Sequence, residues 1–347
     1  MKPKSPEEAR LRTILNSMVE AVFVTDEKGR VTLTNEALDE LIAKDVRGRR
    51  AKNVIKSKEL KVAIRRARKK DKATDVELET EIGDRQHTFF AQVAPLPQGA
   101  GVVTVLHDVT RLKDADRIRR DFVANASHEL RTPLTAIRGF AETLLHGAAE
   151  DPAARERFLN AILRHTLRLQ RLAEDLTLLA KSESPQHDFL DVPTDVRAVC
   201  RESIASLDTF AKKKSIRVTL RAPEEPVLIV TSPRALDGAL INLVENAIKY
   251  SPDGSEVRVS VTREEETVTV AISDDGPGIP PKYHERIFER FYRVDKGRSR
   301  DEGGTGLGLS ITRHLVNRMD GTLELQSAPG EGTTFRLVLP LDVPVDD

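Results

Sequence analysis

Short runs in which apolar and polar residues alternate occupy the first third of the chain. Strict alternation is typical of strands that bury one face. The Glu27-Lys28-Gly29-Arg30 stretch between the first two runs has the residues of a tight turn. With a helical segment expected over residues 8–18, residues 8–110 are predicted to form a small antiparallel sheet with helices on one side. The strand-like runs are residues 21–26, 31–35, 75–82, 88–93 and 101–108.

Residues 111–183 follow a heptad pattern and carry almost no strand signal. Apolar positions at alternating spacings of three and four are typical of helices that pack along a seam. Gly147 and Asp151-Pro152 interrupt the pattern as a helix stop and a helix start. A helical hairpin is therefore predicted, and it should dimerise into a four-helix bundle because two helices alone bury little. The predicted seams are Val123, Ser127, Leu130, Leu134, Ile137, Ala141 and Leu144, then Phe158, Ile162, His165, Leu169, Leu172, Leu176 and Leu179.

The remaining part, residues 190–342, returns to a mixed pattern. A helix is predicted to begin after Ser232, whose hydroxyl suits an N-cap, with Pro233 in its first turn and its end near Tyr250. Strand-like runs lie at residues 256–261, 267–273, 322–327 and 334–339. The chain is thus predicted to be a multidomain α+β protein with domains at residues 8–110, 111–183 and 190–342.

Acidic and basic side chains cancel, with 55 of each among 347 residues. A net charge of zero predicts neither nucleic acid nor an anionic membrane as a partner. Cys200 is the single cysteine, so an intramolecular disulfide is impossible, which fits a reducing cytosol. No run of ~18 apolar residues could cross a bilayer. The chain is expected to be cytoplasmic, either as a whole protein or as the cytoplasmic part of a membrane-anchored sensor.

His128 lies on the first predicted helix of the hairpin, away from its seam. At ~100° per residue it falls ~130° from the seam centre and faces solvent, and Thr132 shares its face. A neutral imidazole is a good nucleophile when a carboxylate orients it, and Glu129 can do so and act as general base. Pro133 removes one helical hydrogen bond, which predicts a bend. Taken alone, an exposed histidine is most often only a surface residue.

The predicted helix that ends near Tyr250 carries a polar stripe. Asn242, Glu245, Asn246 and Lys249 follow the spacing i, i+3, i+4, i+7. An ordinary amphipathic helix with its polar face in water would look the same. Oxygen donors from two asparagines and a glutamate also suit Mg²⁺, which usually keeps phosphates and waters in its shell.

Two glycine-rich segments follow this helix. Asp274 ends a predicted strand, and Gly276 and Gly278 come directly after it. Such a carboxylate can accept a hydrogen bond from an amino group while the backbone approaches a flat ring. Residues 303–310 (GGTGLGLS) enter a helix N-terminus, which suits phosphates. This run is weak evidence alone, because it lacks the Lys-Ser/Thr ending of a P-loop and does not open a βαβ unit.

In their order along the chain, these segments resemble the sensor histidine kinases. The resemblance covers residues 110–342, and it implies a dimeric four-helix bundle and an α/β-sandwich ATP-binding domain of the histidine kinase/gyrase type. The stretch FVANASHELRTPL (122–134) is similar to the phospho-acceptor box, NLVENAIKYS (242–251) to the N box, DDGPGIP (274–280) to the G1 box, IFERFYRVD (287–295) to the F box and GGTGLGLSI (303–311) to the G2 box.

The resemblance implies roles for single residues. His128 is expected to be phosphorylated, Glu129 to assist, and Thr132 to position water for removing phosphate from the partner. Residues 294–305 are expected to form a mobile lid over ATP. The remaining expected contacts are Asn246 with Mg²⁺, Asn242 and Glu245 as further metal candidates, Lys249 and Tyr250 near the phosphates or base, Asp274 at the adenine amino group, Gly276 and Gly278 where the base approaches, Arg293 at the γ-phosphate with Arg290 behind it, and Gly304, Gly306 and Gly308 at the phosphates.

The front part resembles a PAS domain through AVFVTDEKGRVTLTNEALDELI (21–42) and GVVTVLHDVTRLK (101–113). PAS folds hold small ligands or cofactors, or only mediate dimerisation, so the PAS ligand is left unknown. A flavin photosensor is disfavoured because Cys200 lies outside this part. His87 and His107 are interpreted as structural or surface histidines rather than haem ligands. Residues 65–70 (RRARKK) are interpreted as the solvated face of a helix, with a basic contact surface as the alternative.

The expected function is that of a sensor histidine kinase. It would autophosphorylate His128 with Mg-ATP as a homodimer and pass the phosphoryl group to an aspartate in the receiver domain of a response regulator. It would also dephosphorylate that partner. Two alternatives stay open at this point: another ATPase of the superfamily shared with DNA gyrase, and a non-catalytic dimeric scaffold that binds nucleotide without turnover.

Overall fold

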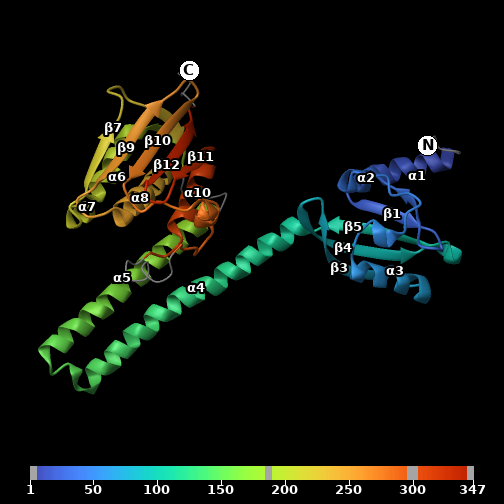
Figure 1. The fold of residues 1–347 in the computed structure, drawn as a ribbon, viewed down its shortest axis with the longest axis horizontal. Helices are drawn as coiled ribbons and strands as arrows, with labels where there is room; N and C mark the ends of the chain where they lie inside the picture. Colours follow the sequence, from blue (N-terminus) through green and yellow to red (C-terminus); the bar gives the residue numbers. More distant parts are fainter. Residues whose placement is uncertain (1–5, 184–189, 295–303, 342–347) are drawn as a thin grey trace. The chain divides into compact units, whose positions relative to one another are not determined.

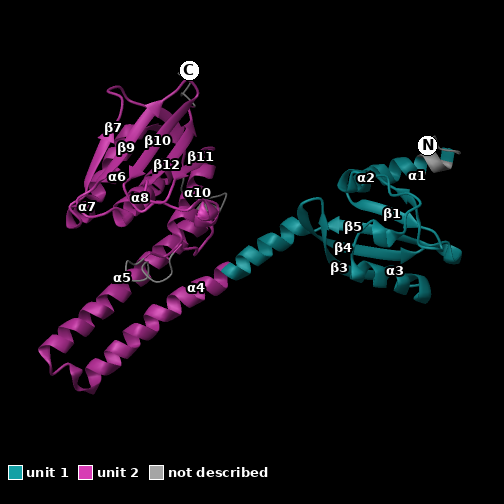
Figure 2. Ribbon diagram, viewed as in Figure 1, with its two compact units in different colours: residues 1–121 teal, residues 122–347 magenta. Residues whose placement is uncertain are grey.

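The computed structural model describes residues 6–183, 190–294 and 304–341. Contacts divide the chain into two compact units, residues 1–121 and 122–347, which are coloured separately in Figure 2. The division falls inside the helix α4 (Thr110–Thr143), so this helix contributes to both units. Most of the predicted hairpin and the predicted nucleotide domain therefore belong to one compact unit.

The first unit is built on a five-stranded antiparallel sheet with the strand order β2-β1-β5-β4-β3 (Figure 1). The predicted antiparallel sheet is confirmed, and its fourth strand is longer than predicted because it pairs with a neighbour on each side. The strands are β1 (Ala21–Thr25), β2 (Val31–Thr34), β3 (Thr74–Ile82), β4 (Arg85–Pro95) and β5 (Val102–Asp108). The helices are α1 (Pro6–Asn16), α2 (Glu36–Ile42) and α3 (Lys58–Lys70), with the short turns η1 (Ala51–Asn53) and η2 (Pro97–Gly99).

The core of this unit lies between the sheet and its helices. Phe23 and Phe89 from the sheet are fully buried with Leu38 of α2 and Leu60 of α3. Ser57 caps α3, because its hydroxyl accepts a hydrogen bond from the backbone N–H of Leu60. The helix α3 therefore begins at a fixed point and turns one apolar face to the sheet.

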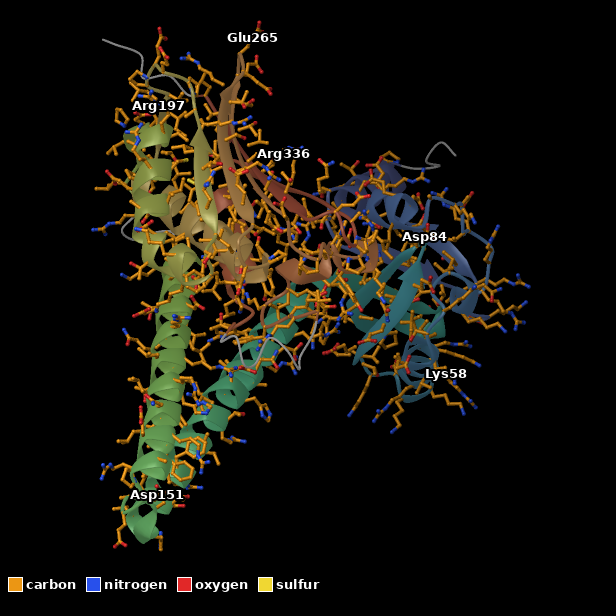
Figure 3. The ribbon with its side chains drawn as sticks, turned by 60° about the vertical axis from the view of Figure 1, so that its left-hand side comes forward. Lys58, Asp84, Asp151, Arg197, Glu265 and Arg336 are labelled. Atoms are coloured by element: carbon orange, nitrogen blue, oxygen red, sulfur yellow. The ribbon has the colours of Figure 1, made fainter. Side chains whose placement is uncertain are left out.

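The second unit opens with the predicted helical hairpin. Residues of α4 run without a break through Pro133, which is buried. A single π-helical turn, η3 (Leu144–Ala148), ends α4, and Gly147 takes the positive φ of 106° that the reversal requires. The returning helix α5 (Pro152–Glu183) begins next to Asp151, which marks this turn in Figure 3.

The predicted seam of α4 is only partly covered within a single hairpin. Val123 and Leu134 are 56% and 54% exposed in the hairpin, whereas Phe122, Leu130 and Pro133 turn inward. The helix α5 covers a face of α4 that is rotated by about one residue from the predicted seam. The exposed positions thus form a second apolar face that the hairpin itself does not cover.

The rest of the second unit packs helices on a mixed sheet with the order β11-β12-β10-β9-β7, in which β7 and β9 are parallel. Its strands are β7 (Arg217–Arg221), β9 (Glu256–Arg263), β10 (Thr267–Asp274), β11 (Thr322–Ser327) and β12 (Thr333–Pro340), and a separate pair is formed by β6 (Val192–Asp195) and β8 (Leu228–Thr231). Its helices are α6 (Val196–Ser206), α7 (Asp208–Lys213), α8 (Pro233–Tyr250) and α10 (Gly308–Arg318), with the turns η4 (Pro281–Tyr283) and η5 (Arg286–Phe288).

One apolar core joins this sheet to the hairpin. Leu236, Leu240 and Leu243 of α8 pack in the same cluster as Leu172 and Leu179 of α5. The α/β fold predicted for residues 190–342 therefore packs on α5 of the hairpin through α8 and α10. None of the helices in the described parts of the chain is both long and apolar enough to cross a membrane.

Candidate functional site

The predicted phospho-acceptor lies on the outer face of α4. His128 is exposed, as its distance from the helix seam predicted. Thr132 is exposed one turn further on, and its Oγ1 donates to the backbone oxygen of His128 at 3.2 Å. The imidazole is thus accessible to a second domain or protein, and Thr132 stands beside it on the same face.

Glu129 was expected to orient the imidazole, and the structure gives its carboxylate a further partner. Nη2 of Arg168 on α5 donates to Oε2 of Glu129 at 2.7 Å. Within the described residues no hydrogen bond joins Glu129 to His128. A charge-assisted bond of this kind is stronger than a neutral one, so Arg168 fixes the carboxylate next to the histidine.

The helix α8 presents the predicted polar stripe. Ser232 accepts from the backbone N–H of Ala235 and caps the helix, as predicted. Asn242, Glu245 and Asn246 are half-buried, whereas the apolar face of α8 is fully covered. Oxygen donors that are partly shielded from water suit a hard cation such as Mg²⁺. Among the described residues no cluster of three or more His, Cys, Asp or Glu could hold a metal.

The end of α8 is held by a lysine that the sequence reasoning missed. Lys214 donates from Nζ to the carbonyl oxygens of Ile248, Lys249 and Ser251 at 3.1, 2.8 and 2.7 Å. A cation at these carbonyls satisfies groups that a helix C-terminus leaves without partners. Lys214 therefore fixes the backbone that carries Lys249 and Tyr250.

Asp274 ends β10 and is 9% exposed. The backbone N–H of Gly276 donates to its Oδ1 at 2.8 Å. Burial raises the pKa of Asp274 from 3.8 to about 6, although the backbone N–H groups of Gly276 and Thr333 act in the opposite direction. Each carboxylate oxygen has more than one lone pair, so this shielded carboxylate can accept a further hydrogen bond.

The glycines bring the predicted nucleotide residues together. A Cβ on Gly276 would meet Oδ1 of Asp274 at 2.6 Å and the backbone oxygen of Tyr250 at 3.1 Å. A Cβ on Gly278, whose φ is +71°, would come within 1.9 Å of a carbonyl oxygen of Ala328. Only glycine fits at position 278, because two backbone segments touch there. At position 276 a larger residue would press on the Asp274 carboxylate.

The second glycine segment approaches α8 from the other side. A Cβ on Gly304 would lie 2.8 Å from Nζ of Lys249 and 3.8 Å from Nη2 of Arg293, and one on Gly308 would lie 3.2 Å from Oδ1 of Asn242. Gly306, with a φ of +74°, accepts at its backbone oxygen from the N–H of Phe291 at 2.8 Å. The predicted N, F and G2 segments therefore meet around α8. Most of the predicted lid, residues 295–303, lies outside the described residues.

Contacts between the hairpin and the nucleotide fold complete the site. Oγ1 of Thr305 donates to Oδ2 of Asp175 on α5 at 2.6 Å, and burial raises the pKa of Asp175 while this hydrogen bond lowers it. The ring of Phe122 on α4 lies 5.8 Å from that of Phe291, and the guanidinium of Arg290 stands 5.4 Å from the centre of the Phe122 ring. Arg290, predicted behind the γ-phosphate, thus reaches the acceptor helix.

A second ion pair also crosses from α5 to α8. Nη1 of Arg171 lies 4.0 Å from Oε1 of Glu245, and both side chains are more than one third exposed. Such a pair contributes little stability. It does show that Glu245, one of the three metal candidates, faces a cation of the hairpin, which distinguishes it from Asn242 and Asn246.

Three sequence families match the chain in succession. Residues 15–114 match the PAS fold, residues 118–185 the His Kinase A (phospho-acceptor) domain, and residues 231–343 the histidine kinase-, DNA gyrase B-, and HSP90-like ATPase. The predicted resemblances to these three kinds of domain are confirmed.

Curated relatives match over most of the chain. It is 38% identical to the sensor histidine kinase WalK of Bacillus subtilis (strain 168) over 69% of this chain and 39% of the relative, and 39% identical to the phosphate regulon sensor protein PhoR of Pseudomonas aeruginosa over 67% and 52%. It is 31% identical to the sensor protein kinase WalK of Staphylococcus aureus over 97% and 82%. The chain spans about half the length of most of the curated relatives it matches.

Among solved structures, the fold is similar to that of the histidine kinase ThkA in its complex with the response regulator protein TrrA. The TM-score is 0.54 at 21% identity, over 95% of this chain and 98% of that one. The Acinetobacter baumannii histidine kinase AdeS gives a TM-score of 0.50 at 24% identity, over 62% and 98%. Both likenesses concern the fold.

Proposed function

The chain belongs to the PAS-containing sensor histidine kinases, and on this premise we propose that it transfers the γ-phosphoryl group of ATP to His128. The phosphoryl group would then pass to an aspartate in the receiver domain of a response regulator. The proposal rests chiefly on one observation. The helix that carries exposed His128 contacts, through Phe122, the segment of Phe291 and Arg290 that adjoins the glycine-rich residues around α8.

In the proposed reaction a ring nitrogen of neutral His128 attacks the γ-phosphorus. The bond between that phosphorus and the bridging β-phosphate oxygen breaks, ADP leaves, and Glu129 accepts the proton of the imidazole. Most of the rate should come from positioning and from neutralised charge, as is general for phosphoryl transfer. Arg293 and Lys249 are the cations we assign to the phosphates, since both approach Gly304.

We assign nucleotide recognition to the two glycine segments. Asp274 would accept a hydrogen bond from the adenine amino group, with Gly276, Gly278 and Tyr250 beside the base. Gly304, Gly306 and Gly308 would line the phosphates. Asn246 and Asn242 would hold Mg²⁺, with Glu245 as the third candidate. A Mg²⁺ ion held there would supply positive charge that neutralises part of the charge on the phosphates.

Thr132 supports a second activity of the same surface. Its hydroxyl lies one turn from His128 on the exposed face of α4. We assign it the positioning of water for removal of phosphate from the response regulator. The same exposed face would therefore serve both the addition and the removal of phosphate on the partner.

We also propose that the hairpin forms a homodimeric four-helix bundle. Its uncovered apolar face includes Val123 and Leu134 on α4, and Leu159, Leu163 and Leu167 on α5, each 48–56% exposed. The three leucines recur at intervals of four residues, which is the spacing of one helix face. A second copy would bury this face and complete the bundle.

Incorporation of labelled γ-phosphate from Mg-ATP tests the proposed function. Wild type and His146→Ala, which removes another exposed histidine of the hairpin, should acquire acid-labile, alkali-stable label. His128→Ala should acquire none. Label in His128→Ala would show that the acceptor is another residue. A wild-type dimer that binds ATP but neither hydrolyses it nor acquires label would favour the non-catalytic scaffold. Hydrolysis of ATP without any labelled protein would favour a gyrase-type ATPase.

A further inference from the structure

The first unit contains a hollow of about 770 Å³ that no role proposed above uses. It lies between the β1–β2 turn, η1, α3 and the loop that joins β4 to β5. This volume is within the range of small-molecule sites, ~300–1,000 Å³. The hollow is therefore large enough for a metabolite-sized ligand.

Apolar side chains form the floor of the hollow. Ala51, Ile55, Leu60 and Ile64 line it, and each is at most 8% exposed. These side chains belong to the core of the unit, so they form a rigid surface. An apolar or planar part of a ligand could lie against the exposed part of Ile64 above this core and be removed from water there.

The rim of the hollow is strongly basic. Glu27 and Asp71 are the acidic residues that line it. Seven basic residues also line the hollow, and among the described residues of this unit none of the seven forms an ion pair. Like charges around one concave surface repel one another and focus a positive potential into it. The basic lining residues are Lys28, Arg50, Lys52, Lys61, Arg65, Arg68 and Lys69.

Around the opening of the hollow, α3 approaches the β1–β2 turn and the β4–β5 loop approaches β1. Nη1 of Arg68 on α3 lies 3.8 Å from the position that a Cβ of Gly29 would take, so this side chain reaches the β1–β2 turn. On the other wall, a Cβ on Gly101 would come within 1.7 Å of the carbonyl oxygen of Thr25, so the β4–β5 loop lies directly on β1. The cations are thus arranged around a defined opening.

The basic run of α3 divides between two faces. Arg65, Arg68 and Lys69 line the hollow, whereas Arg66 and Lys70 belong to the same helix and do not. A merely solvated face would show no such relation to a cavity. Lys58, which begins α3, is labelled in Figure 3 and also lies outside the lining.

We propose that this hollow binds a small anionic molecule that carries at least two negative charges next to an apolar or planar part. The charges would meet the guanidinium groups of Arg65 and Arg68, and the apolar part would lie on Ile64, the most exposed of the four apolar side chains named above. Guanidinium groups bind carboxylates and phosphates with paired hydrogen bonds. This site is independent of the phosphotransfer proposed above, since it lies wholly within the first unit.

Titration of the full chain with 1-naphthyl phosphate tests the proposal, with 1-naphthol and inorganic phosphate as probes of each half of the ligand. The pocket variant is Arg65→Gln with Arg68→Gln, and the matched control is Arg66→Gln with Lys70→Gln. All four arginine and lysine side chains are exposed, so both variants should fold. Both variants remove two positive charges from α3, and only the pocket variant changes residues that line the hollow. The difference in affinity between the two variants therefore reports on the hollow.

Wild type and control should bind 1-naphthyl phosphate at least about tenfold more tightly than either partial probe, and the pocket variant should lose about tenfold in affinity. Equal binding by both variants, or by naphthol and naphthyl phosphate, would overturn the proposal. So would phosphate binding as tightly as naphthyl phosphate, which would indicate a simple counter-ion site. Sedimentation with phosphatidylglycerol vesicles that depends on Arg65 and Arg68, without naphthyl phosphate binding, would instead assign the cations to a membrane surface and overturn it.

Discussion

Arg168 on α5 donates from Nη2 to Oε2 of Glu129 on α4 at 2.7 Å. The pair is largely buried in the hairpin, with 14% of Arg168 and 28% of Glu129 exposed. No other hydrogen bond to the Glu129 carboxylate is found in the described part of the chain. The ion pair therefore fixes the proposed base through one oxygen and leaves Oε1 for the imidazole of His128.

Arg168→Gln should lower the autophosphorylation rate by about tenfold, because the carboxylate loses a charge-assisted hydrogen bond. The KM for ATP should stay unchanged, since the ion pair of Arg168 in the described part of the chain is with Glu129 and not with a proposed nucleotide residue. Single-turnover labelling across a range of ATP concentrations separates these two effects. Arg164→Gln, one turn away on α5 and exposed, is the control. A changed KM with an unchanged rate would contradict a positioning role for Arg168.

Asp274→Asn should weaken ATP binding by at least about tenfold, because an amide nitrogen replaces the carboxylate oxygen available to the adenine amino group. The amide can keep the hydrogen bond from Gly276 through its own oxygen, so the local fold should persist. In wild type, affinity for ATP should fall as the pH decreases through about 6, the pKa of this carboxyl. Isothermal titration at several pH values measures both effects. Unchanged affinity in the variant would remove Asp274 from the base site.

The same carboxyl should influence the stability of the nucleotide-free protein. The folded protein binds the proton of Asp274 more tightly than the unfolded chain does, because burial raises its pKa from 3.8 to about 6. Stability from this group is therefore present below the lower value and is lost as the pH rises through the higher one. Asp274→Asn should raise the Tm at pH 7, and the difference from wild type should shrink at about pH 5. A lower Tm at pH 7 would mean that the carboxylate itself stabilises the fold.

The hydrogen bond from Thr305 to Asp175 ties the nucleotide fold to α5 at a different level of the hairpin from that of His128. Asp175 is seven residues beyond Arg168, about 10 Å along the helix, whereas His128 lies beside Glu129. Asp175→Ala should release the nucleotide fold and raise the autophosphorylation rate roughly three- to tenfold without changing ATP affinity. Asp175→Asn retains an oxygen acceptor for Thr305 and serves as the control. A slower Asp175→Ala would instead show that transfer requires this contact.

The uncovered apolar face of the hairpin should control dimerisation. Leu163→Gln with Leu167→Gln should convert the dimer into monomers at micromolar concentration, because each leucine buried in an interface contributes about 1.5–3 kcal/mol. Light scattering after size exclusion measures the mass. Val62→Gln, a 63% exposed residue of α3, is the matched control. A double variant that stays dimeric would place the interface elsewhere.

Several helix boundaries, exposed positions and close backbone contacts could be predicted from the sequence, because local chemistry determines them. The helix α8 begins after Ser232 and ends at Tyr250, as its cap, proline and apolar period predicted. His128 is exposed because a heptad pattern determines which residues a helix turns away from its neighbours. The glycines at 276, 278 and 306 indicated close backbone approach, and each lies against another segment.

The tertiary structure alone decided which side chains meet. Arg168 pairs with Glu129 across 39 residues, and Thr305 meets Asp175 across 130. A periodic pattern predicts the faces of a helix, but the rotation of its partner determines which face is covered, as Val123 and Leu134 show. Likewise, the sequence did not predict that basic residues of α3 line a hollow, because the β1–β2 turn and the β4–β5 loop that form its other walls are distant in the chain. Such contacts depend on packing between elements far apart in the chain, because local sequence constrains each element's conformation and not its neighbours.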